Sequence, residues 1–148
     1  MIKVIIEIPK GDDRRRHLKY DKTGFIDLGP IKDKIPVNDE VMPVDYGFIP
    51  GTENKIEKDE LDVLLISIKI LKVGDEAEVK PIALMRRDDG DDKIVAVDPD
   101  STMKAWSDVP DATKTAIIDF FGYGHRFNSI ESAAAAMEYI DEARAIIK

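Results

Sequence analysis

Residues 57–70 read EKDELDVLLISIKI, and this stretch places a group of carboxylates at the start of an apolar segment. The run over residues 62–70 is rich in β-branched and leucine side chains, so it predicts a strand. Glu57 and Asp59 share one face of an extended chain, and Asp62 stands where the strand begins. Crowded carboxylates repel one another, and Mg²⁺ relieves that repulsion because it takes oxygen ligands. Taken alone, however, an acidic segment of this kind is more often a solvated turn.

Further short apolar segments precede and follow this one. The other ranges that predict strands are 2–8, 16–20, 25–28, 46–49, 77–85 and 93–97. Two helices are predicted over residues 110–121 and 128–148, the second opened by the capping-box spacing of Asn128 and Glu131. Its apolar stripe comprises Ile130, Ala133, Ala134, Met137, Ile140 and Ile147. Many short strands followed by two helices predict a mainly β fold with flanking helices (α+β), a small β-barrel with helices packed outside.

Composition narrows the possible functions. A length of 148 residues with 43% hydrophobic content suits a single domain over residues 1–148. The absence of cysteine excludes disulfides, thiolate zinc sites and a cysteine nucleophile. A net charge of −8 argues against nucleic-acid binding, which depends on basic surface. No apolar run reaches ~18 residues and the first residues lack a signal-peptide pattern, so we expect no membrane association and a cytoplasmic location.

A second acidic cluster, residues 88–92 (DDGDD), lies between two predicted strands. Gly90 permits a tight turn there, and an ordinary hairpin tip explains the composition equally well. Two acidic clusters at the ends of apolar strands strengthen the case for a shared metal site. Glu7 lies inside a predicted strand on the face of Lys3 and Ile5, where a solvent-facing glutamate is common.

Five motifs follow one another in a distinctive order. They are residues 4–9 (VIIEIP), 45–50 (DYGFIP), 57–64 (EKDELDVL), 91–97 (DDKIVAV) and the pair Phe120 and Phe121. Together they resemble the soluble family I inorganic pyrophosphatases over nearly the whole chain. The resemblance implies an OB-like five-stranded β-barrel with two C-terminal helices. It also implies a homo-oligomeric enzyme that hydrolyses pyrophosphate to two phosphates by Mg²⁺-activated water.

The same resemblance implies roles for individual residues. Asp59 would be the general base beside the nucleophilic water. The metal ligands would be Glu7, Glu57, Asp62, Asp88 and Asp91. Because the turn over residues 88–92 is short, Asp89 is an alternative to Asp88. The substrate-binding residues would be Arg16, Tyr46, Lys93 and His125.

The sequence departs from the family pattern at several phosphate-binding positions. Leu18 replaces a carboxylate, Leu28 replaces an arginine and Met42 replaces a tyrosine. Most of the metal-binding carboxylates are therefore retained, whereas fewer of the side chains that bind phosphate are present. Arg16 and His125 are candidates for compensating charge, although a surface loop explains either side chain as well. Two alternatives remain open: a phosphohydrolase for another phosphoanhydride or phosphate ester, and a non-catalytic descendant that binds metal, phosphate or a protein.

Overall fold

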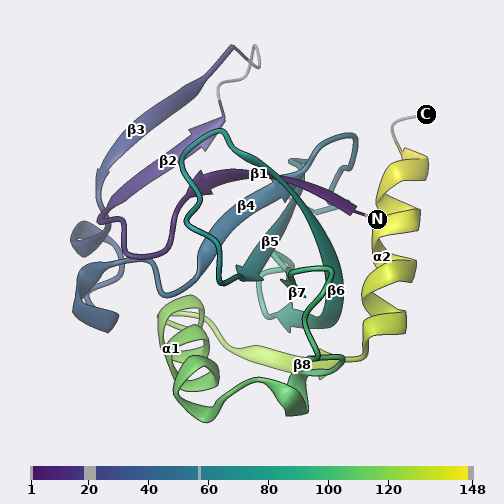
Figure 1. Cartoon of the computed structure of the whole chain (residues 1–148). Helices are drawn as coiled ribbons and strands as arrows, with labels where there is room; N and C mark the ends of the chain where they lie inside the picture. Colours follow the sequence, from purple (N-terminus) through teal and green to yellow (C-terminus); the bar gives the residue numbers. More distant parts are fainter. Residues whose placement is uncertain (1, 19–22, 57, 147–148) are drawn as a thin grey trace.

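The computed structural model describes residues 2–18, 23–56 and 58–146 and is mainly β, as predicted (Figure 1). The strands are β1 (Ile2–Ile8), β2 (Arg14–Leu18), β3 (Phe25–Pro30), β4 (Asp45–Ile49), β5 (Leu61–Ile66), β6 (Glu76–Arg87), β7 (Lys93–Val97) and β8 (Phe127–Glu131). The helices are α1 (Asp111–Phe121) and α2 (Ala133–Ile146), with short 3-10 turns at Ile31–Asp33, Asn38–Glu40 and Trp106–Asp108. Neither α-helix in the described part of the chain is long and apolar enough to cross a membrane.

Five strands close into a ring. The hydrogen-bonded order is β1, β4, β5, β7, β6, and β6 pairs back onto β1. β5 and β7 run parallel, whereas the other four pairs of the ring are antiparallel. β8 adds to β6 outside the ring, and β2 and β3 form a separate hairpin beside it (Figure 1). The predicted five-stranded barrel is confirmed.

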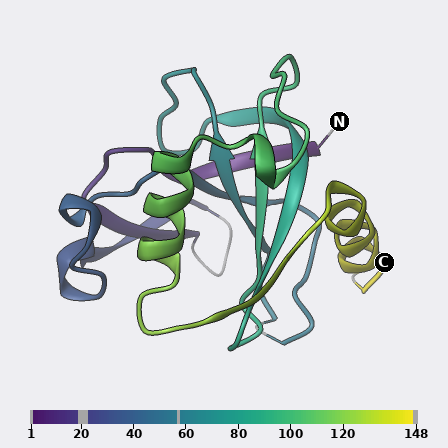
Figure 2. The same ribbon diagram turned by 90° about the horizontal axis from the view of Figure 1, so that it is seen from below.

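Both faces of β5 are buried, which explains its continuous apolar sequence. Val63 and Leu65 belong to one core cluster, together with Ile140 of α2. Leu64, which points the other way, belongs to a second cluster that includes Ile117 of α1. The two helices lie on different sides of the ring, as both views show (Figures 1 and 2). Each helix therefore covers its own core cluster.

The predicted helix over residues 128–148 begins too early in the chain. Residues there form β8, in which Ile130 lies opposite Met85 of β6. The helix α2 begins only at Ala133, and the backbone N–H of Ala135 donates to Ser132 Oγ at 3.2 Å. The ladder to the long strand β6 satisfies the backbone groups of residues 127–131, and this non-local pairing outweighs the local capping signal.

The apolar stripe of α2 is also shifted from its predicted position. Ile140 is buried as expected, but Ile130 and Met137 are 36% and 38% exposed. Ile147 lies outside the described residues. The buried residues of the helix are Ala136, Ile140 and Ala143. Their i, i+4, i+7 spacing still follows a single helical face.

The predicted strand over residues 62–70 ends early. β5 stops at Ile66, and Ile68 and Ile70 are 95% and 94% exposed. The Asp98 carboxylate accepts hydrogen bonds from Ser67 Oγ at 2.7 Å and from the Ile68 backbone N–H at 3.1 Å. This side chain therefore takes over backbone hydrogen bonding where the ladder to β7 ends.

Candidate active site

Two strand starts bring Asp62, Asp91 and Lys93 together. In the parallel pair of β5 and β7, Asp62 lies opposite Lys93. Lys93 Nζ is 2.7 Å from an Asp62 carboxylate oxygen and 3.1 Å from one of Asp91. The Lys93 side chain is only 3% exposed, and a buried ammonium is stable only when it is paired. The two predicted acidic segments therefore meet at one positive charge.

Tyr46 of β4 joins this group from the neighbouring strand. Lys93 Nζ donates to Tyr46 Oη at 3.2 Å and lies 5.3 Å from the centroid of its ring. The ring stacks on Phe121 with centroids 5.8 Å apart. Burial, reinforced by the charges of Asp62 and Asp91, raises the pKa of Tyr46 well above its ordinary value. The hydroxyl therefore stays protonated at neutral pH.

His17 of β2 was not selected as a site residue from the sequence, yet it links Glu7 to Asp59. Its Nδ1 is 3.4 Å from the Glu7 carboxylate, and its Nε2 is 3.0 Å from the Asp59 carboxylate. The backbone N–H of Leu18 also donates to Glu7, at 3.0 Å. Glu7 is 2% exposed, so the interpretation of a solvent-facing glutamate is wrong. The β2 strand covers this end of β1, which local alternation along β1 does not reveal.

The pKa values of His17 and Asp59 are both raised. The hydrogen bond to Glu7 raises the pKa of His17 to about 9, so its imidazole is charged at neutral pH. Burial raises the pKa of Asp59 to about 6; the side chain of Glu60 adds to the rise, whereas the Glu60 backbone N–H and His17 oppose it. The Asp59 side chain is 43% exposed, so solvent reaches it. A carboxylate that titrates near neutrality is suited to accepting a proton.

The turn between β6 and β7 is organised by Arg87. Its Nε and Nη2 contact the Asp89 carboxylate at 2.8 and 2.6 Å, and Nη2 also reaches Asp91 at 3.2 Å. Nη1 donates to the backbone carbonyl of Phe121 at 3.2 Å. The hydrogen bonds from Arg87 hold the pKa of Asp89 well below its ordinary range. Gly90, with a φ of +79°, permits the tight turn that brings these side chains together.

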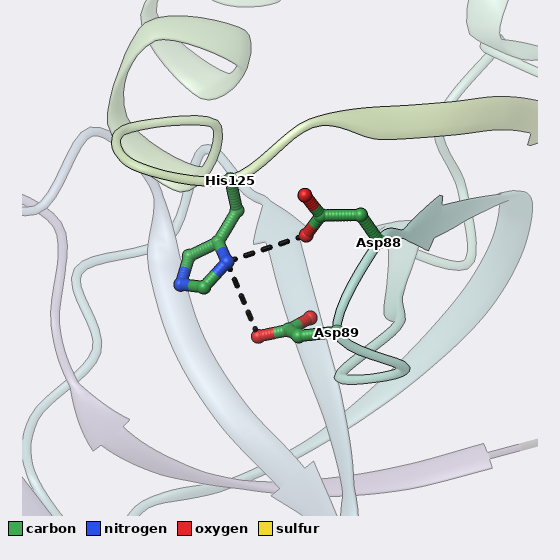
Figure 3. Close-up of side chains that lie close together, drawn as sticks. All are labelled: Asp88, Asp89 and His125. Atoms are coloured by element: carbon green, nitrogen blue, oxygen red, sulfur yellow. Dashed lines mark hydrogen bonds and ion pairs between the residues drawn. The ribbon is translucent and has the colours of Figure 1, made fainter.

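Asp88, Asp89 and His125 form a compact group at the outer side of this turn (Figure 3). His125 Nδ1 lies 3.3 Å from Asp88 and 3.6 Å from Asp89. One donor atom from each residue lies within 4.8 Å of the other two, so the group could hold a divalent cation. The Asp88 backbone N–H donates to the carbonyl of Arg126 at 2.8 Å, which brings the loop carrying His125 to this place.

Asn54, a second residue that the sequence did not reveal, joins the two acidic segments. Its side chain is buried, and Nδ2 donates to the Gly90 carbonyl at 3.1 Å and to Tyr139 Oη of α2 at 3.1 Å. Its backbone N–H donates to the Asp59 carbonyl at 2.7 Å. This residue therefore sets the distance between the loop of Asp59 and the turn at Gly90. Glu57, a predicted ligand in the same loop, lies outside the described residues.

Arg16, a predicted phosphate-binding cation, does not contact the acidic residues of the site that the structure describes. Arg16 Nη1 pairs with Asp12 at 2.5 Å, and it is the next residue, His17, that faces Asp59. Contact between Arg16 and a substrate therefore stays a prediction. Leu28 is 48% exposed on β3, whereas Met42 is buried in the core.

The donors present suit a divalent cation that prefers oxygen. Asp59, Asp62 and Asp91 supply carboxylates, and burial raises the pKa of Asp91 as well as that of Asp59. The raised values indicate that the nearby positive charge does not fully offset the burial of these carboxylates. A divalent cation with oxygen ligands would supply that charge. Asp62 and Asp91, which meet at Lys93, therefore offer ligand atoms of the kind that such an ion takes.

Comparison with known proteins gives one consistent result. Residues 4–148 match the family model described as inorganic pyrophosphatase. An inorganic pyrophosphatase of Sulfolobus acidocaldarius is 38% identical over 133 residues, which are 82% of this chain and 72% of the relative. The inorganic pyrophosphatase of Thermus thermophilus is 33% identical over 129 residues, or 82% of this chain and 70% of that protein.

Solved structures agree with the sequence relatives. A crystal structure of an inorganic pyrophosphatase from Neisseria gonorrhoeae is 30% identical, with a TM-score of 0.82, and the match covers 97% of this chain and 89% of that one. A second, from Ehrlichia chaffeensis, is 26% identical with a TM-score of 0.84, over 95% and 91% of the two chains. The resemblance seen in the five sequence motifs is confirmed, and the chain belongs to the inorganic pyrophosphatase family.

Proposed function

We propose that this chain hydrolyses inorganic pyrophosphate to two phosphates with Mg²⁺ as its cofactor. The observation that carries this proposal is the meeting of Asp62 and Asp91 at Lys93, with Asp59 on the same acidic segment as Asp62. The relatives that match most of the chain are named inorganic pyrophosphatases, which supports the same reaction. In this proposal the barrel would supply oxygen ligands, a proton acceptor and cations for the reaction.

The carboxylates would divide between two tasks. Glu57, Asp62, Asp88 and Asp91 would hold the metal, and Glu7 would reach a further metal ion through water. When bound, Mg²⁺ lowers the pKa of a coordinated water and neutralises phosphate oxygens. Glu7 is buried and bonded to β2, so it would also fix the position of His17.

Asp59 would act as the general base. The water oxygen forms a new bond to one phosphorus, the bond from that phosphorus to the bridging oxygen breaks, and the bridging oxygen leaves with the second phosphate. A proton of the water passes to an Asp59 carboxylate oxygen. His17 Nε2, 3.0 Å from that carboxylate, holds it in orientation. With a pKa of about 6, Asp59 is mostly ionised and able to accept the proton at neutral pH.

The substrate carries negative charge that the protein must balance. Lys93 and the imidazolium of His17 provide positive charge beside Asp62 and Asp59, and the Tyr46 hydroxyl provides a hydrogen-bond donor. Donors fixed before the substrate arrives stabilise the developing charge without a reorganisation cost. Arg16 and His125 are further candidates, and Arg16 would have to leave Asp12 in order to reach a phosphate.

The direct test is phosphate release from pyrophosphate, measured after chelation and again after Mg²⁺ is restored. Asp62→Asn should abolish most of the Mg²⁺-dependent rate, whereas Asp141→Asn, on an exposed position of α2, should not. A panel of nucleotides and sugar phosphates runs alongside. Faster phosphate release from one of these compounds would favour the alternative that the chain is a phosphohydrolase for another phosphoanhydride or phosphate ester. Folded protein that is inactive on every substrate would favour the non-catalytic descendant.

Three further properties are proposed, the first from the family resemblance and the other two from the sequence itself. They are a homo-oligomeric state, a cytoplasmic location and a single domain over residues 1–148. Light scattering coupled to size-exclusion chromatography measures the first, and fractionation of cells measures the second. One cooperative unfolding transition seen by two independent probes would support the third.

A further inference from the structure

Arg87 is a charged residue of the site to which the proposed reaction assigns no role. Its side chain is only 12% exposed, and its guanidinium bridges the carboxylates of Asp89 and Asp91. Nε and Nη2 donate to the two carboxylate oxygens of Asp89 at 2.8 and 2.6 Å, so the ion pair is bidentate. Nη2 also lies 3.2 Å from Asp91 Oδ2.

The guanidinium is engaged at all three of its nitrogens. Besides the contacts to Asp89 and Asp91, Nη1 donates to the Phe121 carbonyl at 3.2 Å. A phosphate would have to break these bonds before it could use Arg87, so the residue is poorly suited to gripping substrate. An arginine guanidinium stays protonated at any working pH. Arg87 is therefore a permanent charge fixed within the turn.

A fixed positive charge between two carboxylates does what a metal ion does at such a pair. Carboxylates that face the same space repel unless a cation lies between them. Asp91 is one of the predicted metal ligands, and Asp89 is the alternative to Asp88. The fork of Arg87 already occupies both oxygens of Asp89. A metal ion bridging Asp89 and Asp91 would have to displace it.

We propose that Arg87 takes the place of a divalent cation between Asp89 and Asp91, so that the chain binds one metal ion fewer at this turn. The inference rests on the proposed function, because metal binding beside Asp62 is part of that function. It concerns only the contact between Asp89 and Asp91; Asp62 and Asp91 meet at Lys93 Nζ, so a metal ion bound by those two carboxylates would lie beside that ammonium. It also assigns Asp89 to Arg87, so the group of Asp88, Asp89 and His125 would offer a cation only Asp88 and His125.

The inference is tested by counting bound metal in the absence of substrate. Mn²⁺ prefers the same oxygen ligands as Mg²⁺, so it is titrated calorimetrically into chelator-treated protein. Arg87→Met removes the charge and keeps an apolar chain in its place. We expect this variant to bind one Mn²⁺ per chain more than the wild type. Arg87→Lys keeps a positive charge and should bind the same number as the wild type.

The neighbouring arginine provides a matched control. Arg86 points to the other side of β6, where it pairs with Asp92 and Glu131, each at 3.3 Å, and lies over the ring of Tyr139. Arg86→Met therefore makes the same change in net charge one residue away from Arg87. Its Mn²⁺ count should equal that of the wild type. An extra ion in both variants would mean that net charge, and not the position of Arg87, decides the count, which would overturn the inference.

An Arg87→Met protein that folds and binds the wild-type number of Mn²⁺ ions would also overturn it. If this variant does not fold, Asp89→Asn decides the question. An unchanged Mn²⁺ count and affinity would support the inference, whereas a lost ion or an affinity about tenfold weaker would refute it. Pyrophosphate hydrolysis by the wild type is measured separately. An inactive wild type with the expected Mn²⁺ counts would end the proposed reaction and leave the role of Arg87 standing.

Discussion

Replacing His17 with alanine is expected to destabilise the metal-free protein at pH 7. The change removes an imidazole that lies 3.4 Å from Glu7 and 3.0 Å from Asp59. Glu7 is 2% exposed, and a buried group that loses a hydrogen-bond partner costs about 1–3 kcal/mol. The bond from the Leu18 backbone N–H to Glu7 remains, so the loss on that side is partial. The contact to the exposed carboxylate of Asp59 adds less than ~1 kcal/mol. We therefore expect a total of about 1–2 kcal/mol.

The loss should depend on pH in a defined direction. The hydrogen bond to Glu7 raises the pKa of His17 from its ordinary value of 6.5 to about 9. A group whose pKa is higher in the folded state stabilises the fold fully below its unfolded pKa, and that contribution disappears as the pH rises through the folded pKa. The advantage of the wild type should thus be complete below about pH 6.5 and should shrink as the pH passes through 9.

The measurement is urea unfolding in the presence of a chelator, at pH 7 and pH 10, followed by fluorescence of the single tryptophan, Trp106. The chain has only two histidines, so His125→Ala is the matched control. His125 contacts partly exposed carboxylates, and its removal should change the free energy of unfolding by less than about 0.5 kcal/mol. A loss in His17→Ala that is equally large at both pH values would refute the electrostatic argument.

Three further changes test other parts of the site. Asp59→Asn should slow pyrophosphate hydrolysis by about 10²–10⁴ and remove the rise in rate with pH near 6; near-normal turnover would exclude Asp59 from the mechanism. Asn54→Ala should cost about 1–3 kcal/mol in urea unfolding and weaken Mg²⁺ binding, because it frees the turn at Gly90; unchanged calorimetric affinity would show that the link does not shape the metal site. Arg16→Ala should weaken hydrolysis more than Arg14→Ala, whose side chain lies in an exposed ion pair; equal and small effects in the assay would place both arginines outside the site.

Local patterns predicted the ring well where a strand is buried on both faces. β5 and β7 have continuous apolar runs, and their burial in two core clusters leaves little ambiguity. β8 was mistaken for the start of a helix because its sequence, FNSIE, has weak alternation and a chance capping-box spacing. Its strand conformation depends on pairing with β6, more than 40 residues earlier in the chain for Ile130 and Met85. No local signal carries that information.

Some parts of the candidate site could be predicted from the sequence, and others depend on how the strands pack. The convergence of Asp62, Asp91 and Lys93 was predictable, because acidic segments at the starts of apolar strands meet when the strands pair. Alternation along the predicted strand over residues 16–20 places Arg16 on one face and His17 on the other. The sequence does not say which of these faces meets Asp59. That choice is made by the packing of β2 over β1. The role of Arg87 likewise depends on a turn whose geometry only the folded chain defines.

The closed ring has a consequence for how such a site can change. Every strand of the ring is paired along both sides, and these ladders are built from backbone groups that no side-chain substitution removes. His17 and Leu28 lie on the separate hairpin, and Arg87 lies at the end of β6, so none of the three is needed to close the barrel. Libraries that vary His17, Leu28 and Arg87 together should therefore contain many folded members. The architecture makes this enzyme family a good starting point for evolving new metal or phosphate specificities in the laboratory.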